Sequence, residues 1–343
     1  MAKLSKSTIT YLDIKYNNKN ITNELDKHIV DWTYTDNLSG QIDDLQLTLE
    51  DVENKWMNSW FPTKGALLEV SKCHRQDNGA IIRTMLGKFE VDEIDARGPG
   101  VQVVIKALST PEKSSLRGQE KSKAWEKATL KMVAGDIAKA NGLKLVFKAN
   151  ETEKKDRIEQ DQQTDIAFLH EQCNSEGLCL KISNNAIVIL DEADYEDKPT
   201  VTTIYRDNKK VDADILVVTW NARTTLTGIY HSCTVKHKDT KSKKLIEGTY
   251  TPPKPPTTTR KLIEKEQVKS VAEAQKLAKK KLRQANKEAT TVDLVIFSKK
   301  HMYAGQTVQL EQFGKFNGKY IISQTTYSNG NTSLKLRKCL VGY

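Results

Sequence analysis

The first third of the chain alternates between hydrophobic and polar side chains, which is the pattern of half-buried β-strands. Residues 45–50 alternate strictly between leucine and a polar residue, and residues 8–16 alternate less regularly. Turn clusters separate further apolar runs. The additional strands predicted by these runs cover residues 66–72, 81–92 and 101–108. We therefore expect an N-terminal β-barrel-like domain, an antiparallel barrel or strongly bent sheet, over residues 1–111.

A helical period replaces this alternation in the middle of the chain. Thr129 can cap an apolar-striped helix for which Gly142 is a left-handed stop. A second helix begins at Thr164 or Asp165 and ends at Gly177. The strands predicted after these helices, the last two joined by a hairpin turn, cover residues 143–147, 178–182 and 186–190. Residues 112–199 are thus expected to form a small α/β insertion domain. The acidic segment 191–197 leads the chain out of this domain.

Strand-like patterning returns in the last part of the chain, over residues 211–237 and again over 291–340. We expect residues 200–343 to form a second, C-terminal β-barrel-like domain. The predicted fold class is α+β and β-rich, with two barrel-like antiparallel β domains flanking a small α/β domain and one long helix in the C-terminal domain.

Two other features interrupt the strands of this last domain. Residues 239–261 combine a lysine cluster with the string Thr251–Pro256, where proline favours an exposed, extended loop. Residues 267–288 are rich in Ala, Lys, Gln and Glu and carry a narrow apolar stripe, which predicts a helix that lies across a sheet.

The chain is basic, with 54 Lys and Arg against 44 Asp and Glu and a formal net charge of +10. Such a charge suits nucleic acid, an acidic membrane surface or an acidic partner protein. Much of the excess lies in 236–244 and 276–287, where no aromatic residues are interleaved to stack on bases. Nucleic-acid binding is therefore kept as an alternative function class.

No membrane insertion is expected, because no apolar run approaches the roughly 18 to 20 residues of a spanning helix. The first ten residues contain lysines and lack an apolar signal core. We accordingly expect synthesis and folding in the cytoplasm.

The cysteines are odd in number, scattered and without a Cys-x-x-Cys pair, which favours buried free thiols over a disulfide framework. They are Cys73, Cys173, Cys179, Cys233 and Cys339.

A search for metal and nucleotide sites finds weak candidates. His231, Cys233 and His237 would share one face of a strand, but they lack a fourth ligand, which favours structural roles. The glycine-rich string Arg97–Gly100 lacks the spacing of a dinucleotide loop or a P-loop and is better explained as a hairpin turn. We assign no cofactor and no metal.

Carboxylates raise the alternative of a cell-wall hydrolase component, since a pair of them can hydrolyse a glycosidic bond. Their spacing does not separate a catalytic pair from a solvated surface, and no Gly-x-Ser-x-Gly nucleophile elbow occurs. The clusters are Asp43–Asp44, Glu50–Asp51, Asp92–Glu93 and Asp191–Asp197. We assign no catalytic residue and expect a protein that is not an enzyme.

The string Phe89–Ile94 is followed by the turn Arg97–Gly100, and near the end of the chain Tyr303–Val308 is followed by Gly314 and Gly318–Ile322. The motifs between them are Ser115–Arg117, Trp125, Thr129–Leu130, Asn141–Leu143, Asp161–Gln162, Thr164–Leu169 and Gly177–Leu178. In this order the motifs resemble the phage late control D protein family over roughly residues 30–340, and the last group resembles the closing barrel of that family.

The resemblance implies a baseplate hub of a contractile phage tail or of a tail-like bacteriocin. It implies a homotrimeric ring in which two barrel-like domains per subunit adapt the sixfold tail tube to the threefold central spike. The implied partners are a tail tube or tube-initiator protein, the spike protein and other baseplate proteins, within a virion or tail-like particle. Two β regions flanking an α/β insertion suit such a ring, because ring closure covers strand edges.

Overall fold

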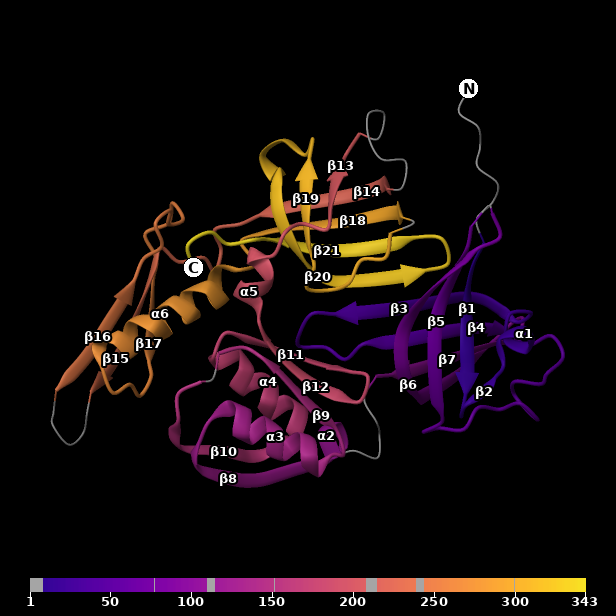
Figure 1. Ribbon diagram of the computed structural model, residues 1–343, viewed down its shortest axis with the longest axis horizontal. Coiled ribbons are helices and arrows are strands. Elements are labelled where there is room, and N and C mark those ends of the chain that lie inside the picture. Colours follow the sequence, from indigo (N-terminus) through magenta and orange to yellow (C-terminus); the bar gives the residue numbers. More distant parts are fainter. Residues whose placement is uncertain are drawn as a thin grey trace.

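The computed structural model describes residues 9–76, 78–109, 115–150, 152–207, 215–238, 244–298 and 300–343. Four groups of elements follow one another along the molecule (Figure 1). An N-terminal β unit lies at one end of the long axis, a C-terminal β unit and an α/β unit lie in the middle, and a smaller sheet with a long helix lies at the other end.

The N-terminal β unit wraps seven strands and one helical turn around a single apolar core. The three alternating leucines of residues 45–50 point inward and are fully buried, as their spacing predicted. The turn at 97–100 joins two neighbouring strands. The elements are β1 (Ile9–Tyr16), β2 (Lys19–Asn20), α1 (Thr22–Leu25), β3 (Ile29–Asn37), β4 (Asp44–Glu50), β5 (Leu67–Arg75), β6 (Ile81–Arg97) and β7 (Gln102–Leu108).

The α/β unit places two helices between a two-stranded and a three-stranded sheet, so that one core serves all of them. Its elements are α2 (Ser115–Gly118), β8 (Glu120–Ala128), α3 (Leu130–Ala140), β9 (Lys144–Lys148), β10 (Lys155–Thr164), α4 (Asp165–Ser175), β11 (Leu178–Ser183), β12 (Ala186–Asp191) and α5 (Glu192–Asp197). Strands β11 and β12 form the predicted hairpin, and β9 pairs parallel to β12.

The predicted helix boundaries of this unit are confirmed. The Thr129 hydroxyl accepts a hydrogen bond from the Met132 amide, and Thr164 caps the next helix in the same way. Gly142 and Gly177 follow the two helices with φ of +67° and +68°, the left-handed conformation that glycine adopts without strain.

The C-terminal β unit curls five strands and a short parallel strand around a separate core. Contact between β13 and β14 brings the two ends of this sheet near each other. The elements are β13 (Thr202–Tyr205), β14 (Ile215–Thr224), β18 (Thr290–Ser298), β19 (Thr307–Glu311), η1 (Gly314–Phe316), β20 (Gly318–Ser328) and β21 (Thr332–Lys338).

Residues 229–238 and 244–289 form a separate small layer, and we call the segment 229–289 the arm. It consists of β15 (Ser232–Lys238), β16 (Leu245–Tyr250) and β17 (Lys261–Lys265), covered on one face by α6 (Val271–Asn286). The helix predicted across a sheet is confirmed. The extended loop predicted over 239–261 is wrong for residues 245–250, which pair with β15 as a strand; residues 239–243 lie outside the described part of the chain.

The β-rich α+β class is confirmed, with two differences from the antiparallel barrels predicted. Parallel pairs occur between β13 and β19 and between β15 and β17. The two β units are also not separate sheets, because β20 pairs antiparallel with β3 and joins them into one sheet of thirteen strands. The domain boundaries stay predictions; the first lies within residues 110–114, outside the described residues.

A glycine sets how closely α6 approaches its sheet. A Cβ built on Gly248 of β16 would lie 2.5 Å from the Gln275 amide nitrogen and 2.6 Å from the Ala274 Cβ, so only glycine fits. The helix backbone therefore rests directly on the strand.

We expect Gly248→Ala to lower the free energy of unfolding by about 1 to 3 kcal/mol, because the added methyl group meets backbone that cannot move aside. Gly135→Ala in α3 is the matched control. Its Cβ would meet only the Leu145 side chain at 3.7 Å, so helix propensity should leave stability unchanged or slightly higher. Urea unfolding of both variants checks this, and equal effects would contradict it.

Candidate functional site

The seam between the two β units is built on a pair of stacked tyrosines. Tyr34 of β3 lies opposite Tyr327 of β20 in the strand register, with ring centroids 6.2 Å apart and nearly parallel planes. Phe89 meets the Tyr34 ring edge-on at 5.7 Å. Burial raises the pKa of both tyrosines far above the usual range, so both rings stay neutral.

The residues that follow β18 complete this seam. The Tyr327 hydroxyl donates to the Met302 carbonyl at 2.7 Å and accepts from the Met302 amide at 2.6 Å. His301 stacks on the Tyr327 ring at 4.5 Å and meets Tyr303 edge-on at 4.3 Å. Lys72, from β5 of the N-terminal β unit, lies over Tyr327 at 4.3 Å, so both β units contribute to one cluster.

Burial lowers the pKa of both basic side chains in this cluster, His301 and Lys72. The pKa of His301 falls to about 3, mainly by desolvation and further by the nearby Lys72, and burial lowers the pKa of Lys72 to about 8. Neither ring nitrogen of His301 has a hydrogen-bond partner among the described residues. The seam therefore requires a neutral imidazole.

A second contact holds the α/β unit against the seam. Lys181 of β11 donates to Asp36, to the Asn37 carbonyl at 2.7 Å and to Asp43. The other oxygen of Asp36 accepts from the Ala304 amide at 2.8 Å. One lysine thus links the α/β unit to β3, while Asp36 links β3 to the C-terminal β unit.

The pKa values of this triad follow from its burial. Desolvation raises the pKa of Asp43 to about 6, because the attraction of Lys181 offsets it only in part. Burial alone would lower the pKa of Lys181, but Asp43 and Asp36 outweigh it and raise the pKa. Lys181 therefore stays charged and donates hydrogen bonds to both carboxylates.

A buried ion cluster joins α5 to the C-terminal β unit and the arm. Arg337 of β21 is 1% exposed and places its two terminal nitrogens 2.5 Å from Glu192 and 2.5 Å from Glu196. Arg283 of α6 lies 2.6 Å from Glu196, and Lys287 lies 3.5 Å from Glu192. Desolvation opposes ionisation of Glu192, but Arg337 and Lys287 outweigh it and lower its pKa.

The sequence pattern does not reveal this cluster, because it predicts only an acidic exit segment over residues 191–197. The available signal was the spacing of Glu192 and Glu196, which places both carboxylates on one face of a helix. That face is buried, and Asp191 caps the helix by accepting from the Ala193 amide at 2.9 Å.

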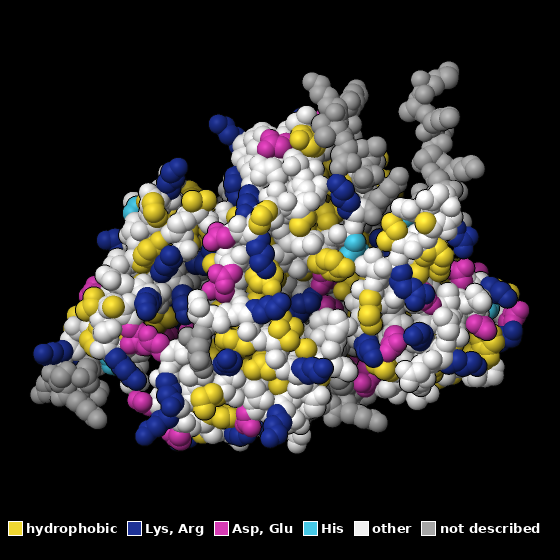
Figure 2. Space-filling model, in the orientation of Figure 1, with side chains coloured by type: hydrophobic (Ala, Val, Ile, Leu, Met, Phe, Trp, Pro, Cys, Tyr) yellow, Lys and Arg dark blue, Asp and Glu magenta, His cyan; other side chains and the backbone are white. Residues whose placement is uncertain are grey.

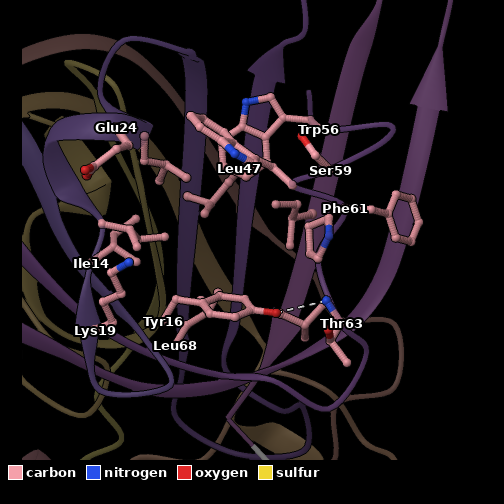
Figure 3. A pocket seen from close by; sticks show the side chains of 16 residues that line it. Ile14, Tyr16, Lys19, Glu24, Leu47, Trp56, Ser59, Phe61, Thr63 and Leu68 are labelled. Atoms are coloured by element: carbon pink, nitrogen blue, oxygen red, sulfur yellow. Dashed lines mark hydrogen bonds between the residues drawn. The ribbon is translucent and has the colours of Figure 1, made fainter. Parts of the chain in front are cut away.

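A pocket of about 500 Å³ lies in the N-terminal β unit, lined by residues of α1 and of the loop after β4 (Figure 3). Trp56 and Trp60 line it from the loop after β4, and His28 meets both rings edge-on. The Tyr16 hydroxyl accepts from the Thr63 amide at 2.9 Å at the opposite wall. Since Lys19 and Glu24 are its charged side chains and the remaining lining is largely apolar, the pocket can hold an apolar group but offers no paired carboxylates for hydrolysis.

The other candidate residues have structural surroundings. Among the described residues no group of three or more His, Cys, Asp or Glu side chains could hold a metal ion. Cys233 packs against α6, and the Asp51 carboxylate accepts from the Trp56 and Met57 amides. All five thiols are free and four are buried, as predicted, with Cys339 half-buried.

The described chain thus brings together a seam and two polar contacts that fix three units against one another. No helix in the described ranges is long and apolar enough to cross a bilayer. Such an arrangement holds the units in fixed relative positions.

Comparisons of sequence and structure show similarity to phage tail proteins. No family model matches the chain. A probable baseplate hub protein of Escherichia phage 186 is 27% identical over 177 residues, which is 51% of this chain and 43% of that protein. The corresponding protein of Escherichia phage P2 is 28% identical over 152 residues, 44% of this chain and 37% of that protein. The matches span less than half the length of either relative.

Solved structures share the fold across nearly the whole chain. A tail protein from Neisseria meningitidis has a TM-score of 0.71 at 14% identity, covering 96% of both chains. An E. coli component of the type VI secretion system, described as similar to T4 bacteriophage tail proteins, has a TM-score of 0.56 at 10% identity and covers 92% of this chain and 75% of that one. The resemblance to phage baseplate hub proteins indicated by the sequence motifs is confirmed.

We expect the stability of the protein to fall by about 2 kcal/mol between pH 7 and pH 5 through His301 alone. The folded-state pKa of His301, about 3, lies below the usual value near 6.5. The stabilisation that the neutral imidazole provides is therefore complete above pH 6.5 and is lost as the pH falls below it. His301→Phe keeps a stacked ring without a titratable group and should remove this part of the pH dependence. Urea titrations of both proteins at the two pH values measure the difference, and identical slopes would refute the prediction.

Arg337→Met should lower the free energy of unfolding by about 3 to 5 kcal/mol, because it leaves two buried carboxylates short of a cation. Adding Glu192→Gln and Glu196→Gln should recover part of the loss. Lys106→Met is the control, because Lys106 forms an exposed pair with Glu93 at 2.9 Å and its loss should change stability by less than about 1 kcal/mol. Chemical denaturation compares the variants, and a small effect of Arg337→Met would show that the cluster does not hold the units together.

Proposed function

We propose that this protein is a structural, non-enzymatic baseplate hub of a contractile phage tail or a tail-like bacteriocin. The observation that carries the proposal is the seam, in which β3 and β20 join two β units of one chain into a single sheet. The similarity to baseplate hub proteins of two Escherichia phages supports it independently.

The hub acts as a homotrimeric ring. Three copies with two β units each present six β units around a threefold axis, which suits an adaptor between a sixfold tail tube and a threefold central spike. Its partners are then the tail tube or tube-initiator protein, the spike protein and other baseplate proteins. The ring assembles in the bacterial cytoplasm and becomes part of the virion or tail-like particle.

An exposed apolar face supports self-association. Among the described strands β14 pairs with β18 alone. Leu216 of β14 and Phe297 of β18 lie opposite each other on one face and are 46% and 45% exposed. Exposed apolar side chains are unfavourable in water, and burial against a neighbouring subunit removes them from it.

Light scattering coupled to size-exclusion chromatography should give the mass of three chains, and negative-stain images should show threefold rings. The double variant Leu216→Glu/Phe297→Glu should shift the protein to monomers, because it places carboxylates in the buried interface. Met132→Glu changes a side chain that is 55% exposed on α3 and should leave the trimer intact. A wild-type protein that stays monomeric at high concentration would overturn the proposal.

A further inference from the structure

The net charge of the molecule is confined to the arm. Residues 229–289 hold 16 Lys and Arg against 6 Asp and Glu, a formal charge of +10 that equals the charge of the whole chain. The other residues hold 38 of each sign and sum to zero. In the space-filling view basic side chains lie over the whole visible face, and outside the arm acidic side chains balance them in number (Figure 2). The positive field of the protein therefore originates at one end of its long axis.

Part of this charge is used inside the molecule. Arg283 and Lys287 face the buried carboxylates of α5, and Lys280 lies 3.1 Å from Glu176 at the end of α4. These cations fix the arm to the α/β unit and are not free for a partner.

Four lysines of the described arm strands lie on the face of the sheet that is turned away from α6. The inner face packs Cys233 and Val235 against the helix, so alternate residues of each strand point outward. The residues that the register places on this outer face include Lys236 and Lys238 of β15, Leu245 and Glu247 of β16, and Lys261, Ile263 and Lys265 of β17.

Positive charges are in excess on this outer face, and their mutual repulsion destabilises the sheet. Lys236 lies directly opposite Lys265 in the register of β15 and β17, and like charges opposite each other destabilise a sheet. Glu247, 3.3 Å from Lys236, is the acidic residue of this face among the described residues. An acidic partner would relieve the repulsion.

Apolar side chains lie among the lysines. Ile263 and Leu245 are 59% and 61% exposed. Tyr250, which could stack on a base, is on the inner face, where it packs with the core of the arm. Lysine ammonium groups beside exposed aliphatic residues, without an aromatic platform or arginine forks, fit a protein surface better than nucleic acid.

We propose that the outer face of the arm sheet is a docking surface for an acidic protein surface that carries apolar residues. Carboxylates of the partner meet Lys236, Lys261 and Lys265, and its apolar side chains cover Ile263. Because the charge is concentrated at one end, it also orients the approaching partner and speeds association at low salt. This inference goes beyond the hub function and does not depend on the number of subunits.

The test measures binding of the full-length protein to three labelled probes by fluorescence anisotropy at low and physiological salt. They are a peptide of about twenty glutamates, the same peptide with a few leucines in place of glutamate, and a DNA duplex of similar charge. We expect the leucine-containing acidic peptide to bind most tightly and every affinity to fall with salt.

Variants locate the surface. Lys236→Gln/Lys261→Gln/Lys265→Gln should weaken binding of both peptides by about tenfold or more, and Ile263→Ser should weaken only the leucine-containing peptide, by about threefold. The matched control replaces three exposed lysines of α3 and β9 by glutamine, namely Lys131, Lys139 and Lys144, and should leave binding within about twofold.

Two results would overturn the proposal. If the DNA duplex binds more tightly than either peptide, the arm is a nucleic-acid surface. If the control triple variant weakens binding as much as the arm triple variant, the attraction is a property of overall charge. Since all substitutions are at surface positions, an unchanged circular dichroism spectrum confirms that each variant is folded.

Discussion

The pairing of β3 with β20 is the interaction on which the rest of the structure depends. It joins strands that lie almost three hundred residues apart, at Tyr34 and Tyr327, and no local preference of either strand could produce it. Bringing such distant segments together costs conformational entropy, which grows slowly with loop length and is recovered only when many contacts form together. The stacked rings, the Met302 hydrogen bonds and the Asp36 link all form at this one place, so the seam closes as a unit.

Around the seam, buried charged groups determine how the α/β unit is oriented relative to the continuous sheet, which apolar packing alone would not do. Burying ions costs several kcal/mol each, and a well-made pair recovers little beyond that cost. The gain is directional, because the planar fork of Arg337 meets two carboxylates of α5 in few arrangements. Lys181 acts similarly between β11 and β3. The α/β unit is therefore held at a defined angle to the continuous sheet.

Local features of the fold could be predicted from the sequence, since they depend on neighbouring residues. Thr129 and Gly142 bound a helix because a hydroxyl cap and a left-handed glycine act within one turn. Strands β8 and β10 could not be predicted, because they bury few side chains, among them Ile158 and Gln160, and show almost no apolar alternation. Strand β16 lies beside a lysine cluster and a proline run, and only its pairing with β15 makes it a strand. Among the candidate site residues, the burial of Glu192 and Glu196 depends on cations more than eighty residues away.

The confinement of charge to the arm also bears on the behaviour of the free polypeptide before it finds its partners. Without residues 229–289 the molecule would have a formal charge of zero and would sit near its isoelectric point at neutral pH. Proteins in that condition lose the mutual repulsion that keeps them dispersed, and open sheet edges then favour precipitation. The arm therefore supplies the net charge that keeps the free polypeptide dispersed in solution.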